Sequence, residues 1–153
     1  MPSPKRRGAV SLARRVLLGS NANDSPRRRR LLVPPLLFVG VFAAYALGVF
    51  SISGGVVFLA GQAAVLGVLV AAVLAYRRAG LALACATVYG ALLGHSADHY
   101  LLGLPGRPLG ERVVALVGLD GLVFVGVEAL ALGTIAWVVG AGGRLAVERV
   151  RAA

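Results

Sequence analysis

The chain contains very little cysteine and few charged residues. A single cysteine among 153 residues, Cys85, excludes an internal disulfide and any metal site built on several thiolates. Only 14% of the residues are charged, whereas soluble domains carry about a quarter. Acidic residues are especially scarce, with 6 Asp and Glu against 16 Lys and Arg, and 58% of the residues are hydrophobic. This composition indicates a membrane protein rather than a soluble domain.

Charge is absent altogether from a long internal stretch. Residues 31–76 form a run of 46 positions without Asp, Glu, Lys or Arg. A helix that crosses the bilayer needs about 20 apolar residues, so this run is long enough for two. The serines and paired glycines of "FSISGG" divide it, which predicts spans over about 31–50 and 55–76. We expect a third span over 79–100 and a fourth over 113–140, separated by the Gly- and Pro-rich loop "LLGLPGRPLGER".

The sequence therefore predicts an all-α integral membrane protein, a four-transmembrane-helix bundle over residues 31–140. A basic N-terminal tail (1–30) precedes the bundle and a short basic tail (141–153) follows it. We expect the N-terminal tail not to be a cleaved signal, because "NANDSPRRRR" separates its paired arginines from the apolar run. The tail is either disordered or, over "AVSLARRVLLG", a short basic amphipathic helix at the inner membrane interface.

The basic residues predict how the chain is oriented. With four spans, the two tails and the turn at Arg77 and Arg78 share one face, which holds 14 of the 16 basic residues; the other face holds Arg107 and Arg112. The positive-inside rule then places both termini in the cytoplasm, here at the cell (plasma) membrane. Anionic lipid headgroups are the expected partner of the N-terminal tail. Nucleic acid is disfavoured because the tail has no aromatic residue to stack on bases.

Small residues recur at four-residue steps along the third span, at Ala82, Ala86, Gly90 and Gly94. Such a stripe lets membrane helices approach closely. It predicts a packing face toward another span, toward a second copy of the chain or toward a partner membrane protein. Three glycines of the fourth span also fall on roughly one side, which favours a close hairpin of spans three and four: Gly118, Gly126 and Gly133.

Polar side chains gather in the outer half of the predicted bundle. Ionisable groups at membrane depth are costly, so each is a candidate site residue. Counting 1.5 Å per residue from the outer end of each span, five polar residues reach this region, and all four spans contribute: Tyr45, Gln62, His95, Asp98 and Asp120. The sequence predicts a ligand- or proton-binding pocket that opens to the outside.

The stretch "GHSADHY" contains both histidines of the chain. His95, Asp98 and His99 are spaced i, i+3, i+4 and share one helix face. Imidazole and carboxylate groups in this pattern suit one zinc or iron ion. The alternative is that these residues lie in water and headgroups at the end of a helix and bind nothing. In that case no cofactor is expected.

Glu128 is the deepest acidic residue of the fourth span, about 24 Å from Arg112 on a straight helix. We expect it to form an interhelical hydrogen bond, with Thr87 or Tyr89 as partners at that depth, or to bind a proton or ligand together with Asp120. Few polar residues lie nearer the cytoplasm on this span, which favours a pocket over a complete path across the membrane.

Three classes of function remain open. The first is a non-enzymatic structural or partner-binding membrane subunit. The second is a transport or sensing element that uses the outer polar pocket, with a bound metal or proton. The third and weakest is a metal-dependent membrane enzyme, because we identify no catalytic residue. Ser96 follows His95 directly, so the two side chains point in different directions on a helix. Cys85 lies in an apolar stretch, where a thiol is unreactive.

Overall fold

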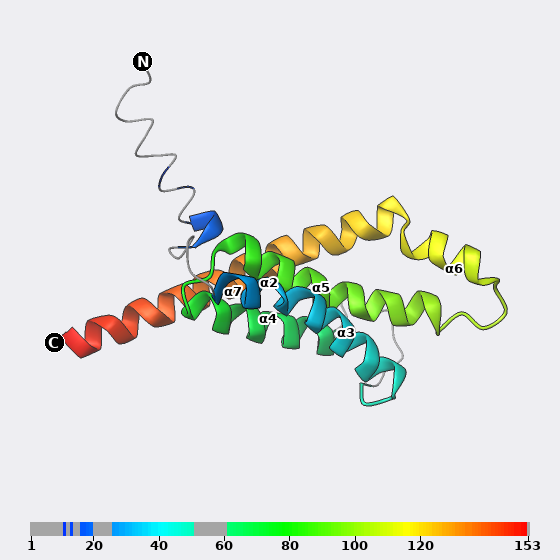
Figure 1. Ribbon diagram of the computed structural model, residues 1–153, viewed down its shortest axis with the longest axis horizontal. Helices are drawn as coiled ribbons and strands as arrows, with labels where there is room; N and C mark the ends of the chain where they lie inside the picture. Colours follow the sequence, from blue (N-terminus) through cyan, green and yellow to red (C-terminus); the bar gives the residue numbers. More distant parts are fainter. Residues whose placement is uncertain (1–10, 12, 14–15, 20–25, 51–60, 153) are drawn as a thin grey trace, which may run out of the picture.

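The computed structural model describes residues 11, 13, 16–19, 26–50 and 61–152, and within these ranges every named element is a helix. Figure 1 shows their arrangement. The elements are α2 (Pro26–Leu31), α3 (Val33–Ala46), α4 (Gly61–Tyr76), α5 (Leu81–Leu101), α6 (Leu109–Leu116) and α7 (Leu119–Ala152). The all-α prediction is confirmed.

Two of these helices are long and apolar enough to cross a membrane. They are the continuous stretch Arg29–Ala46, which joins α2 to α3, and α7, Leu119–Ala152. The described part of α4 is apolar but has only 16 residues. The last turns of α5 carry polar side chains, among them His95, Asp98 and His99, which lower its hydropathy.

The first helix ends earlier than the predicted boundary at residue 50. Its last helical residue is Ala46. Gly48 has a φ of +72°, a left-handed conformation that glycine adopts without a steric penalty. The backbone N–H groups of Val49 and Phe50 both turn back to donate to the Ala44 carbonyl. The predicted break at "SISGG" and the predicted start of span two at residue 55 lie outside the described residues.

The stretch predicted as one helix over 113–140 belongs to two helices. The chain leaves helical geometry at Val117 and resumes at Leu119, so residues 113–116 belong to α6. At its other end α7 continues through Ala152, across the segment expected to be a tail. Figure 1 shows this last part of α7 projecting beyond the other helices toward the C-terminus. Ala, Leu, Glu and Arg are strong helix formers, so the helix continues after the apolar sequence has ended.

Helix α5 occupies the centre of the arrangement. It packs against α3, α4, α6 and α7, and α4 also packs along α7. One buried cluster joins α4, α5 and α7: Ala64, Ala71, Ala84, Val88, Leu92, Val125, Ala129 and Ala136. A second cluster attaches α3 to this core: Val41, Tyr45, Ala63 and Ala91.

The C-terminal half of the small-residue stripe on α5, Gly90 and Gly94, packs against α3. A Cβ atom added at Gly90 would lie 2.5 Å from the Pro34 carbonyl oxygen, and one added at Gly94 would lie 2.7 Å from the Phe38 carbonyl oxygen. Real Cβ atoms do not approach backbone so closely. Glycine at these positions therefore allows the two helix backbones to touch, and α3 of the same chain covers this half of the stripe.

The three glycines of the predicted fourth span contribute unequally to packing. A Cβ at Gly133 would lie 2.6 Å from Cys85 Cα on α5, whereas a Cβ at Gly126 would meet nothing within 4 Å. Gly118 faces Ala115 of its own turn. The predicted close contact between the third and fourth spans therefore depends on Gly133, while Gly118 and Gly126 take no part in it.

Part of the N-terminal tail packs against the α4–α5 turn. Residues 16–18 are helical, and Gly19 forms an isolated antiparallel bridge with Ala79. A Cβ at Gly80 would overlap the Leu17 carbonyl oxygen, so glycine is required for this close contact. The disordered alternative does not hold for residues 16–19.

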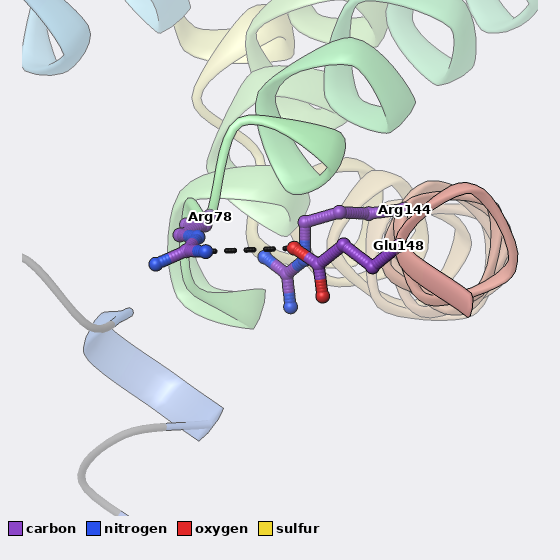
Figure 2. A network of polar contacts seen from close by, with 3 residues as sticks. All are labelled: Arg78, Arg144 and Glu148. Atoms are coloured by element: carbon purple, nitrogen blue, oxygen red, sulfur yellow. Dashed lines mark hydrogen bonds and ion pairs between the residues drawn. The ribbon is translucent and has the colours of Figure 1, made fainter. Parts of the chain in front are cut away.

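The α4–α5 turn also contacts the C-terminal half of α7. Arg78 Nη2 lies 3.4 Å from Glu148 Oε1. The same carboxylate oxygen lies 3.7 Å from Nε of Arg144, one helical turn earlier on α7. Figure 2 shows the three side chains together. The indole N–H of Trp137 donates to the Ala79 carbonyl at 3.3 Å. The N-terminal segment, the α4–α5 turn and the end of α7 thus lie at one end of the molecule.

We predict opposite effects for the same substitution at two glycines of α7. Gly126→Ala has open space for its methyl group and gains about 1 kcal/mol of helix stability. Gly133→Ala forces a methyl group against Cys85, and overpacking of this kind costs about 1–3 kcal/mol. Thermal unfolding of the detergent-solubilised protein, followed by circular dichroism, measures both. Equal shifts in the two variants would contradict the close packing of α7 on α5.

Candidate functional site

A cavity of about 150 Å³ lies between α5, α6 and α7. Four polar residues line it: His95, Ser96 and Tyr100 from α5, and Glu128 from α7. Its apolar wall consists of Leu92, Leu93, Leu116, Gly121, Leu122, Phe124 and Val125. This cavity brings an imidazole and a carboxylate together within an otherwise apolar region.

Helical periodicity selects the residues that each helix presents. On α7, Gly121, Val125 and Glu128 follow one another at intervals of four and three residues, so they share one face. On α5, Ser96 and Tyr100 are four residues apart and share a face in the same way. A Cβ added at Gly121 would meet nothing within 4 Å, so the absence of a side chain there leaves part of the cavity open.

The break before α7 determines the depth of Glu128. Because α7 starts at Leu119, Glu128 lies nine residues, or about 14 Å, from the start of its helix. His95 lies six residues, or about 9 Å, from the end of α5 at Leu101. Both side chains therefore reach the same cavity, whereas a straight helix from Arg112 would have carried Glu128 about 10 Å deeper.

The two ionisable groups of the cavity have unused hydrogen-bonding capacity. His95 Nδ1 is buried without a hydrogen-bond partner, and the imidazole ring packs on Tyr45 with ring centroids 4.7 Å apart. Glu128 is half-buried and, within the part of the chain that the structure describes, has no ion pair or hydrogen bond. Ser96 donates its hydroxyl proton to the Leu92 carbonyl at 3.2 Å, which leaves its oxygen free to accept.

The five polar residues expected in an outer pocket do not all line this cavity. His95 does, and Tyr45 lies behind it, buried and in contact with the imidazole ring. Asp98 is buried but does not line the cavity, and Gln62 and Asp120 are exposed. Asp120 is in the first turn of α7, where a negative charge is favourable beside the helix N-terminus.

The partners expected for Glu128 lie elsewhere. Thr87 is fully buried and donates to the carbonyl of Leu83 on its own helix at 2.7 Å. Tyr89 lines a different, apolar groove on the other side of α7, together with Val127 and Leu130. Both residues precede His95 by about two turns of α5. The depth of Glu128 counted along a straight helix from Arg112 was too large, so it pointed to residues of α5 that lie too deep.

The residues described do not include three His, Cys, Asp or Glu side chains close enough together to hold a metal ion. His99 is exposed and packs on Tyr100, with ring centroids 5.2 Å apart, whereas Asp98 is 7% exposed. The zinc or iron site at His95, Asp98 and His99 stays a prediction from spacing.

Arg112 has a structural role that its charge alone did not reveal. Its Nη1 donates to the Leu101 carbonyl at 2.9 Å and its Nε donates to the Arg107 carbonyl at 2.8 Å. The first bond satisfies a terminal carbonyl of α5, and both fix the loop that leads to α6. Arg112 therefore holds α6 where Leu116 can close the cavity. A basic residue shortly after a helix end is a weak signal of this role.

Comparisons with known proteins add no further identification: protein-family models, curated proteins and solved structures were searched, and none matches this chain.

Proposed function

We propose that the chain is an integral membrane protein that crosses the bilayer four times with both termini in the cytoplasm. The exposure of its apolar helices supports this. Only 22% of the apolar window of α7 is buried, and only 11% of the window in Arg29–Ala46. The core helix of a soluble protein would be mostly buried. Val123, Val127 and Leu130 are each about 60% exposed, as expected for side chains that face lipid.

The distribution of charge supports the proposed orientation. Glu148 contacts both Arg78 and Arg144. This contact lies at the end of the molecule where the N-terminal segment packs against the α4–α5 turn. Arg107 and Arg112 lie in the loop and helix that follow the opposite end of α5. The first end would face the cytoplasm and the second the outside, in agreement with the positive-inside rule.

We infer further that the protein is a non-enzymatic binding or sensing element whose cavity takes a small organic cation from the outside. The observation that carries this proposal is the carboxylate of Glu128, which has no ion-pair partner among the described residues and lies in the same cavity as His95. An unpaired carboxylate inside a membrane protein is costly, and a cation would offset that cost. Aromatic rings at Tyr100 and Phe124 line the same cavity and attract ammonium groups.

A binding pocket is better supported than a transport path. On the cytoplasmic side of Glu128, the polar side chains of the apolar part of α7 are already bonded. Thr134 donates to the Leu130 carbonyl at 2.6 Å, and Trp137 donates to the Ala79 carbonyl at 3.3 Å. On this part of α7 only the hydroxyl oxygen of Thr134 is left to accept, and one acceptor does not make a path for an ion that has reached Glu128.

A structural or partner-binding subunit is the second candidate. An apolar groove of about 440 Å³ runs between α5 and α7. Gly126 lines it, and a side chain there would meet nothing within 4 Å. A helix of another membrane protein would find close backbone contact at this position.

We predict that a quaternary ammonium ion stabilises the protein through Glu128. At ten times its dissociation constant, tetramethylammonium would add about 1.4 kcal/mol, which raises the melting temperature by about 3–6 °C for a chain of this size. The measurement compares tetramethylammonium chloride with sodium chloride at equal ionic strength. Glu128→Gln should lose the shift. Asp120→Asn, which removes an exposed carboxylate from the same helix, should retain it. Absence of any shift in the unaltered protein would contradict cation binding.

We predict opposite sidedness for the α5–α6 loop and the C-terminus. In a Cys85→Ala background, a cysteine introduced by Arg107→Cys should react with a membrane-impermeant maleimide in intact cells. A cysteine introduced by Ala152→Cys should react only after the cells are lysed. The Cys85→Ala protein itself measures unspecific labelling. Reaction of both cysteines in intact cells would contradict the proposed topology.

A further inference from the structure

A second cleft, of about 190 Å³, lies at the opposite end of the molecule from the His95 cavity. It is formed where the N-terminal segment meets the α2–α3 junction and the α4–α5 turn. Its lining consists of Leu17, Leu18, Arg30, Leu31, Arg78, Ala79, Gly80, Ala82, Leu83 and Ala86. Two arginines thus stand beside an apolar wall, and the described residues of the lining include no acidic side chain.

Close backbone contacts build the entrance of this cleft. Gly19, at a φ of +81°, and Gly80 allow the N-terminal segment to lie directly against the α4–α5 turn. Leu17 and Leu18 form one wall and remain 48% exposed, so about half of each side chain stays open to the surroundings. Arg78 holds a left-handed conformation, with a φ of 66°, at the end of α4.

The floor of the cleft is the N-terminal half of the small-residue stripe on α5. Ala82 and Ala86 are both exposed, whereas Gly90 and Gly94 are buried under α3. From Leu81 to Ala86 the helix rises by about 8 Å. A shallow apolar groove therefore leads from the arginines along α5, in the direction of the bilayer centre under the proposed topology.

We propose that this cleft binds one anionic phospholipid, with the phosphate between Arg30 and Arg78 and an acyl chain along Ala82, Leu83 and Ala86. Guanidinium groups bind phosphate oxygens in charge-assisted pairs. A soluble anion would contact only the two arginines, and a neutral lipid would use only the apolar groove along α5. The proposal rests on the membrane placement under the proposed function, because only then do the arginines lie at headgroup level beside anionic lipid of the cytoplasmic leaflet.

Glu148 is the internal competitor of the phosphate group. It lies 3.4 Å from Arg78, and both side chains are at least half exposed, so the pair adds little stability. Glu148 keeps Arg144 as a second partner at 3.7 Å. A phosphate can therefore replace it at Arg78 without leaving its carboxylate unpaired. Figure 2 shows the carboxylate of Glu148 reaching toward Arg78 beside the guanidinium of Arg144.

The single tryptophan of the chain provides the measurement. Trp137 donates to the carbonyl of Ala79, which lines the cleft. The full-length protein is reconstituted into phosphatidylcholine vesicles that contain increasing fractions of phosphatidylglycerol with brominated acyl chains, and quenching of Trp137 fluorescence is recorded. Brominated phosphatidylcholine, in parallel vesicles, measures contact with bulk lipid.

We expect phosphatidylglycerol to be preferred over phosphatidylcholine, by about fivefold for each guanidinium group. The double variant Arg30→Gln/Arg78→Gln should lose the preference. The matched control Arg149→Gln/Arg151→Gln removes the same charge from the end of α7, outside the cleft, and should retain it. Glu148→Gln should increase the preference because it frees Arg78.

Three results would overturn the proposal. The first is equal quenching of the unaltered protein by the two brominated lipids. The second is a loss of preference in the Arg149→Gln/Arg151→Gln control as large as in the cleft variant, since this would assign the effect to net charge. The third is displacement of the lipid by millimolar inorganic phosphate. If neither lipid quenched Trp137, the membrane placement itself would fail, an outcome distinct from all three.

Discussion

Close contact between the backbone of α5 and the backbones of its neighbours is the constraint on which the rest of the structure depends. Lipid removes the hydrophobic drive for helices to associate, so packing must come from short-range contact. Gly90 and Gly94 bring α3 onto one side of α5, and Gly133 brings α7 onto another. A methyl group at any of these positions would collide with backbone. Few other residue choices would allow α5 to have several packed neighbours.

The central position of α5 separates its polar residues. His95 and Ser96 line the cavity beside α7, Asp98 is buried apart from that cavity, and His99 is exposed. A cluster that is compact in sequence thus divides among different environments on one helical turn. The break at Val117 then raises Glu128 to the level of His95. As a result Glu128 of α7 and His95 of α5, which are far apart in the sequence, line the same cavity.

The two ends of the molecule differ in chemistry. The cavity near the end of α5 combines Glu128 with a histidine and aromatic rings, whereas the cleft near its start combines Arg30 and Arg78 with an apolar groove. The two share no lining residue. Along α5 the nearest lining residues of the two sites, Ala86 and Leu92, are about 9 Å apart, so each site can be altered without touching the other. A cation outside and an anionic lipid inside would both follow from this asymmetry.

The sequence by itself determined the helical class, because long apolar runs and strong helix formers are local properties of the chain. It also determined the asymmetry of charge between the ends, since arginine positions need no folding to be counted. It did not determine where α3 and α7 end or begin: Gly48 and Val117 depart from helical geometry inside stretches whose hydropathy is continuous. Nor did it determine that Glu128 and His95 line one cavity while Asp120 lies outside it. Those outcomes depend on helix breaks and on which faces pack together, and only the tertiary contacts of α5 decide them.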